Sequence, residues 1–118
     1  MLVHSVMSAP VETVDADATC AEVQAFFEAR GLRRAPVVDG GELVAMVTDR
    51  DLVAAAPRTI DELEAGEDHA FHRTPVRRVA SQRVLSVGPN DSVEQAASLM
   101  LRSKVGGLPV VDAGEVVG

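Results

Sequence analysis

The segment Pro36-Val37-Val38-Asp39 returns 73 residues later as Pro109-Val110-Val111-Asp112. The same offset, with no gap, aligns residues on both sides of these segments. Val6, Ser8, Val11 and Val14 align with Val79, Ser81, Val84 and Val87, and Gly41-Glu42 aligns with Gly114-Glu115. A chain of 118 residues can bury one modest core. The sequence therefore predicts two copies of one supersecondary unit.

Helix-capping patterns also recur at equivalent positions of the two copies. Thr19 with Glu22, and Ser92 with Gln95, each read Ser/Thr-x-x-Glu/Gln, which is the pattern of a capping box. Apolar residues at helical spacing follow each box, so each copy is expected to begin a helix there. Gly31 is expected to end the first helix, because glycine adopts the left-handed conformation that closes a helix.

Two short apolar runs follow each predicted helix, and an Asp/Gly turn separates the two runs of each pair. The runs cover residues 35–38 and 43–47 in the first copy, and 108–111 and 116 onward in the second. They are predicted to be consecutive strands. A second helix is expected from Thr48 to the residue before Pro57, since proline cannot continue the helical hydrogen-bond ladder. The unit is therefore β-α-β-β-α, and the fold class is α+β.

The repeat divides the chain into three parts. They are a first unit (1–56), an acidic linker (57–73) and a second unit (74–118). Ile60, Leu63 and Phe71 are expected to hold the linker against the rest of the molecule. Gly118 aligns with Ala45, so the second unit is C-terminally incomplete. We therefore expect that the sequence ends inside a strand and that the natural protein continues.

Composition narrows the classes of partner. The formal net charge of −7 disfavours nucleic acid and anionic membrane surfaces as partners. Aromatic residues make up only 3% of the chain, so stacking platforms for bases are scarce. The single cysteine, Cys20, cannot form an internal disulfide, and no signal peptide or membrane span is evident. We therefore expect a cytoplasmic protein.

Three segments together carry a resemblance to a known family. They are Val6-Met7-Ser8, Leu32-Arg33-Arg34-Ala35-Pro36-Val37-Val38-Asp39, and Leu43-Val44-Ala45-Met46-Val47-Thr48-Asp49-Arg50-Asp51. The chain resembles the cystathionine β-synthase-type (CBS) domain pair. This resemblance implies that two repeats pack about a pseudo-twofold axis, with nucleotide-binding clefts between them, and that two such pairs form a disc-shaped homodimer.

The chain departs from the family pattern at two places. The family usually has Gly where Ala45 stands, and the larger side chain is expected to narrow a nearby cleft. The second copy also lacks its own Thr-x-x-Asp motif, because the sequence ends at Gly118. A second half-site is therefore missing from this sequence.

The motif Thr48-Asp49-Arg50-Asp51 is the strongest candidate for a ligand site. A Thr48 hydroxyl at a helix N-terminus would lie beside unpaired backbone N–H groups, which suit a phosphate. Asp51, one turn on, could accept hydrogen bonds from both hydroxyls of a ribose. The alternative is structural: Thr48 and Asp51 could form a variant capping box. The two roles are compatible, since a carboxylate has about four lone-pair sites.

Other candidates flank this motif. By resemblance, Arg33 faces the nucleotide phosphates and Arg34 lies beside it, although both could be solvated at a strand entrance. Met46 is either a core residue or part of an adenine pocket. Gly106-Gly107 replaces the two arginines in the second copy, either as a simple turn or as backbone that approaches a ligand.

The sequence offers no catalytic machinery. It has no nucleophile–base pair, no P-loop and no dinucleotide fingerprint, so we expect no enzyme and no required cofactor. His69 and His72 in the acidic linker are expected to be solvated rather than metal ligands. The favoured function is a sensor module that binds AMP, ADP, ATP or S-adenosylmethionine and regulates either a separate protein partner or a longer protein or assembly that contains it. The alternative is a structural dimerisation module with a vestigial cleft.

Overall fold

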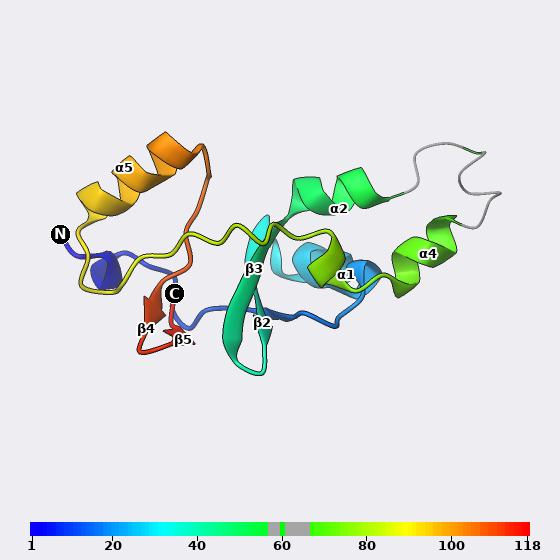
Figure 1. Ribbon diagram of the computed structural model, residues 1–118, viewed down its shortest axis with the longest axis horizontal. Coiled ribbons are helices and arrows are strands. Elements are labelled where there is room, and N and C mark those ends of the chain that lie inside the picture. The colour runs from blue at the N-terminus through cyan, green and yellow to red at the C-terminus, as the bar shows by residue number, and fades with distance from the viewer. Residues whose placement is uncertain (57–59, 61–66) are drawn as a thin grey trace.

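The computed structural model describes residues 1–56, 60 and 67–118 (Figure 1). The helices are α1 (Cys20–Arg30), α2 (Asp49–Ala55), α4 (Glu67–Arg73) and α5 (Val93–Ser103), with short 3-10 turns η1 (Val3–Ser5) and η2 (Val76–Arg78). The strands are β1 (Val14–Asp15), β2 (Arg34–Asp39), β3 (Glu42–Thr48), β4 (Val111–Asp112) and β5 (Glu115–Val116). The first repeat follows the predicted order β-α-β-β-α as β1-α1-β2-β3-α2, and the molecule is an elongated body of 52 × 28 × 24 Å.

Local chemistry sets the ends of α1. The Thr19 hydroxyl accepts a hydrogen bond from the Glu22 N–H at 3.2 Å, so Thr19 is the N-cap. Within the described chain no return bond from the Glu22 side chain accompanies it, so the full capping box predicted here is wrong. The helix ends at Gly31, whose φ of 65° is the left-handed conformation expected of a C-cap glycine. Val23 and Phe27 face the core and are buried.

The first repeat forms a three-stranded sheet in the order β1-β2-β3. β1 runs parallel to β2, with Val14 opposite Val37, whereas β2 and β3 form an antiparallel hairpin. Gly40 and Gly41 take φ values of 59° and 87° in the connecting turn, a conformation that residues with a side chain rarely adopt. Val37 and Val47 bury their side chains completely.

The second repeat copies this arrangement in shorter form. A parallel bridge joins Val87 to Val110, at the positions equivalent to Val14 and Val37. Ser92 and Gln95 form the complete predicted capping box at the start of α5. The helix closes at Lys104, whose φ of 56° repeats the left-handed conformation of Gly31. β4 and β5 then pair as an antiparallel hairpin.

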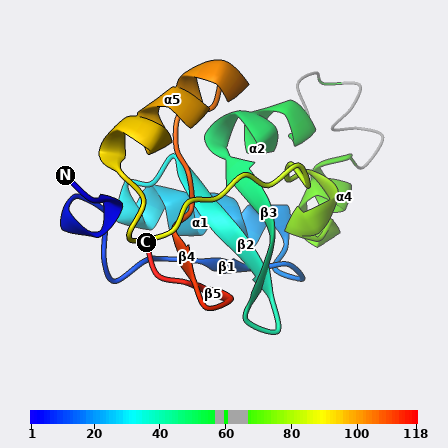
Figure 2. The ribbon, with the colours of Figure 1, turned by 60° about the vertical axis from the view of Figure 1, so that its left-hand side comes forward.

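The opening segment of each repeat packs against the core of the other repeat. Residues 1–13 open the first repeat, before β1, yet the Val3 N–H donates to the Asp91 carbonyl at 2.8 Å, and Val3 is buried with Val87 in the second core. Residues 74–86 open the second repeat, before Val87, yet Val76 is buried in the first core, and its N–H donates to the Ala18 carbonyl. Figures 1 and 2 show the N-terminus beside α5, while η2 lies near α1.

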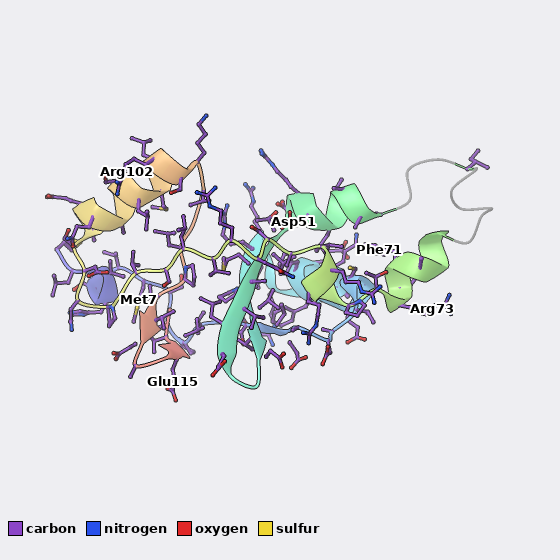
Figure 3. All side chains as sticks on the ribbon, in the orientation of Figure 1. Met7, Asp51, Phe71, Arg73, Arg102 and Glu115 are labelled. Carbon is purple, nitrogen blue, oxygen red and sulfur yellow. The ribbon has the colours of Figure 1, made fainter. Side chains whose placement is uncertain are left out.

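Helix α4 occupies part of the stretch expected to be a linker. Phe71 is 5% exposed and joins the first core, as expected, and Figure 3 shows it between α4 and α1. Ile60 is 73% exposed, so its expected contact is wrong, and Leu63 lies outside the described residues. The side chain of His69 is likewise not described.

Within the described residues, neither a cluster of metal-binding side chains nor a membrane-spanning helix is found. No group of three or more His, Cys, Asp or Glu side chains lies close enough there to hold a metal ion. No described helix combines the length and the apolarity needed to cross a bilayer.

Candidate functional site

A cavity of about 460 Å³ lies where the two repeats meet. Its walls come from the β3–α2 junction, from the chain that leads into α5, and from the turn that follows α5. It is lined by Arg33, Arg34, Met46, Thr48, Asp49, Arg50, Asp51, Ser81, Arg83, Leu85, Lys104, Val105, Gly106, Gly107 and Leu108. The structure thus brings all eight residues singled out from the sequence to one cavity. Its size falls within the roughly 300–1,000 Å³ typical of small-molecule sites.

Thr48 and Asp51 form a reciprocal capping box at the start of α2. The Thr48 hydroxyl accepts from the Asp51 N–H at 3.2 Å, and the Asp51 Oδ2 accepts from the Thr48 N–H at 2.9 Å. The next two amides are also occupied: the Asp49 N–H donates to the Arg33 carbonyl, and the Arg50 N–H donates to the Asp49 side chain. The expectation of unpaired N–H groups beside Thr48 is therefore wrong. An anion at this place would have to be held by side chains.

The capping box leaves ligand-binding capacity on both residues. The second carboxylate oxygen of Asp51, Oδ1, has no hydrogen-bond partner in the described chain. The Thr48 hydroxyl accepts one hydrogen bond and keeps its own proton to donate. Figure 3 shows Asp51 at the N-terminal end of α2, near the middle of the molecule. The structural role of this pair is therefore present and does not use up the groups that a ribose or phosphate would contact.

One side of the cavity is built by contact between the repeats. The Met46 N–H donates to the Ser81 carbonyl at 3.0 Å, and the Ser81 N–H donates to the Met46 carbonyl at 2.8 Å. This antiparallel bridge attaches the lead-in of the second repeat to strand β3 of the first. Met46, Leu85 and Leu108 give the cavity an aliphatic part. A flat apolar group such as a nucleobase could pack there without an aromatic partner.

Positive charge gathers around this cavity although the chain is acidic. Five cationic side chains and two acidic ones line it, a surplus of three positive charges in a chain with a net charge of −7. None of these cations forms an ion pair with a described residue, whereas Arg30 and Arg77, elsewhere in the fold, do. The cations are Arg33, Arg34, Arg50, Arg83 and Lys104. Like charges gathered without partners favour an anionic ligand.

Arg34 packs directly against the glycine pair. A Cβ at Gly106 would lie 2.8 Å from a terminal nitrogen of Arg34, and a Cβ at Gly107 would lie 2.7 Å from its Cδ. Under the 73-residue offset, Gly106 and Gly107 are the equivalents of Arg33 and Arg34. Two arginine pairs facing each other would clash and repel. The glycines therefore make room for Arg34.

A second cavity, of about 420 Å³, lies on the other side of Arg34. The offset relates its lining to that of the first cavity, with Ser8, Pro10 and Glu12 where the first has Ser81, Arg83 and Leu85. The position of Lys104 is occupied by Gly31 in this second cavity. The two cavities therefore differ in charge although the backbone repeats.

Sequence reasoning missed several lining residues, above all Arg83 and Lys104. Neither belongs to a local motif, and both reach the cavity only through the packing of one repeat on the other. The offset offered one signal, because it aligns Arg83 with Pro10 and Lys104 with Gly31, a gain of two charges at equivalent positions.

Two related repeats that meet at a shared cavity define a tandem-repeat class of protein, and comparison with known proteins identifies its family. A family model described as CBS domain matches residues 3–58 and 76–118. The chain belongs to the CBS domain family, as the sequence resemblance predicted. It is 34% identical over 116 residues to the CBS domain-containing protein YhcV of Bacillus subtilis (strain 168), covering 98% of this chain and 76% of that protein.

Solved structures confirm the fold of a CBS domain pair. The CBS domain of a CBS domain containing membrane protein from Sphaerobacter thermophilus superposes with a TM-score of 0.84 at 30% identity, over 100% of this chain and 81% of that one. CBSX2 in complex with AMP superposes with a TM-score of 0.80 at 26% identity, over 99% and 87% of the two chains.

Proposed function

We propose that this protein is a non-catalytic regulatory module that binds an adenosine nucleotide in the larger cavity. The observation that carries the proposal is the set of five cations, none paired with a described residue, that line one cavity together with Asp51, whose Oδ1 has no hydrogen-bond partner in the described chain. The likeness to CBSX2, which was solved with AMP bound, supports this choice of ligand. A cytoplasmic location, a homodimer and a regulated protein partner belong to the same proposal.

Each group has a distinct role in this proposal. Asp51 accepts hydrogen bonds from the ribose hydroxyls through the oxygen that the capping box leaves free. The Thr48 hydroxyl donates to a phosphate oxygen, and the Arg33 and Arg50 guanidinium groups face the phosphate charge. Met46 packs against the base.

The alternative, a structural module with a vestigial cleft, loses one of its supports. Ala45 is buried within β3 and does not line the cavity, so the expectation that it narrows the cleft is wrong. A cleft without function would also have no reason to keep unpaired cations together, since their mutual repulsion destabilises the fold.

Isothermal titration calorimetry with AMP tests the proposal, and thermal unfolding gives a second readout. We expect saturable binding, and nucleotide at about 100 times its dissociation constant should stabilise the fold by about 2.7 kcal/mol. If adenosine, AMP, ADP and ATP all fail to bind and to shift the unfolding midpoint, the structural module is the better description.

A further inference from the structure

The positive charge of the larger cavity, of about 460 Å³, bears on how many phosphate groups its ligand carries. Arg33 and Arg34 reach both cavities, whereas Arg83 and Lys104 line only the larger one. The offset aligns these two cations with Pro10 and Gly31, so the surplus belongs to one cavity and is not a general property of the repeat. It must therefore be explained by what that cavity binds.

A monophosphate leaves part of this charge uncompensated. A nucleoside monophosphate carries about two negative charges, and each further phosphate adds roughly one more. The surplus of three positive charges is balanced by a diphosphate and fully compensated by a triphosphate, whereas a monophosphate leaves about one positive charge uncompensated. Arg83 comes from the lead-in of the second repeat and Lys104 from the end of α5, so the cations enclose the cavity from several elements rather than marking one phosphate position.

We infer that the larger cavity selects a nucleoside carrying two or more phosphates, with Arg83 and Lys104 as the residues that determine this specificity. The inference rests on the proposed function. It disfavours S-adenosylmethionine, whose sulfonium and ammonium groups outweigh its single carboxylate. Guanidinium groups without protein partners suit the task, because they can bind phosphate oxygens in a bidentate manner without first breaking an ion pair.

Calorimetry with adenosine, AMP, ADP, ATP and S-adenosylmethionine, in buffer containing EDTA to remove divalent cations, tests this inference. We expect ADP or ATP to bind at least about tenfold more tightly than AMP, the size expected of one added charge-assisted contact. S-adenosylmethionine is expected to bind more weakly than AMP. Raising the salt concentration should weaken ATP binding more than adenosine binding.

Matched variants locate the effect. The double variant Arg83→Gln, Lys104→Asn removes both cations, and asparagine tolerates the left-handed conformation at position 104. It should abolish the preference for ADP and ATP over AMP, so that the three nucleotides bind the variant with affinities within about threefold of one another. The control is Arg102→Gln, which removes a charge from α5 outside the cavity lining (Figure 3).

Each outcome has a defined meaning. Equal affinity for AMP, ADP and ATP would overturn the inference and leave the proposed function intact. An equal loss in the Arg102→Gln control would also overturn it, because the effect would then be long-range charge and not contact within the cavity. Failure of every nucleotide to bind would remove the proposed function and this inference with it.

Discussion

Asp51 is placed to serve both the fold and the ligand, and two substitutions separate these roles. Its Oδ2 accepts from the Thr48 N–H at 2.9 Å, and its Oδ1 is free for a ligand. In Asp51→Asn, the amide oxygen can still accept from the Thr48 N–H, but an NH₂ group replaces the second acceptor. In Asp51→Ala, both functions are lost.

The expected magnitudes differ for the two variants. Asp51→Asn should weaken nucleotide binding roughly 10- to 150-fold, corresponding to about 1.5 to 3 kcal/mol for hydrogen bonds to a charged group. Its free energy of unfolding should fall by only about 0.3 to 1 kcal/mol, the contribution of an acid in the first helical turn. Asp51→Ala should bind equally weakly and lose about a further 0.5 to 1.5 kcal/mol of stability with the capping hydrogen bond.

Calorimetry for affinity and urea unfolding for stability provide the two measurements. Gln95→Ala is the matched control, because Gln95 makes the same return bond to the Ser92 N–H in the other repeat at 2.9 Å, away from the cavity. Gln95→Ala should lose about 0.5 to 1.5 kcal/mol of stability, the part that belongs to the capping hydrogen bond, and should keep the parental affinity for nucleotide. Parental affinity in Asp51→Asn would refute the reasoning and leave Asp51 with a structural role alone.

Two further predictions concern packing and titration. Gly107→Ala should lower stability by about 0.5 to 1.5 kcal/mol, the cost of displacing the half-buried Arg34 side chain from its rotamer, because the new methyl group meets its Cδ. An Arg34→Ala background should relieve this cost in urea unfolding, and an unchanged cost there would contradict the contact. Burial raises the pKa of the Cys20 thiol above its ordinary value of 9.0. The unfolded chain ionises first, so stability should fall as the pH rises above about 9, and iodoacetamide should react only after unfolding; rapid labelling of the native protein would show that the thiol is accessible.

Much of the fold was predictable because its signals are local. A hydroxyl residue before each long helix, Gly31 after the first, and Gly40-Gly41 between two apolar runs fix the helix and strand bounds through backbone geometry. At Thr19 the sequence predicts a full capping box, but only the bond from the Glu22 N–H to the Thr19 hydroxyl forms in the described chain. A sequence motif indicates which hydrogen bonds are possible, and the tertiary surroundings decide which of them form.

The candidate site was predictable only in part. Thr48 and Asp51 stand out because they share a motif within one helical turn. Arg83 and Lys104 carry no such pattern, and their place at the cavity depends on the Met46–Ser81 bridge and on how α5 ends. The availability of the helix amides could not be predicted from sequence either, because the Asp49 N–H donates to the carbonyl of Arg33, which lies just before β2.

The opening segment of each repeat packs in the core of the other repeat, and this arrangement couples the stability of the two cores. Val76 completes the core of the first repeat and Val3 that of the second, so each core contains a residue from the opening segment of the other repeat. Neither repeat can lose its structure without exposing apolar surface of the other. We therefore expect the two halves to unfold as one cooperative unit, so that a substitution in either core changes the free energy of unfolding of the whole chain.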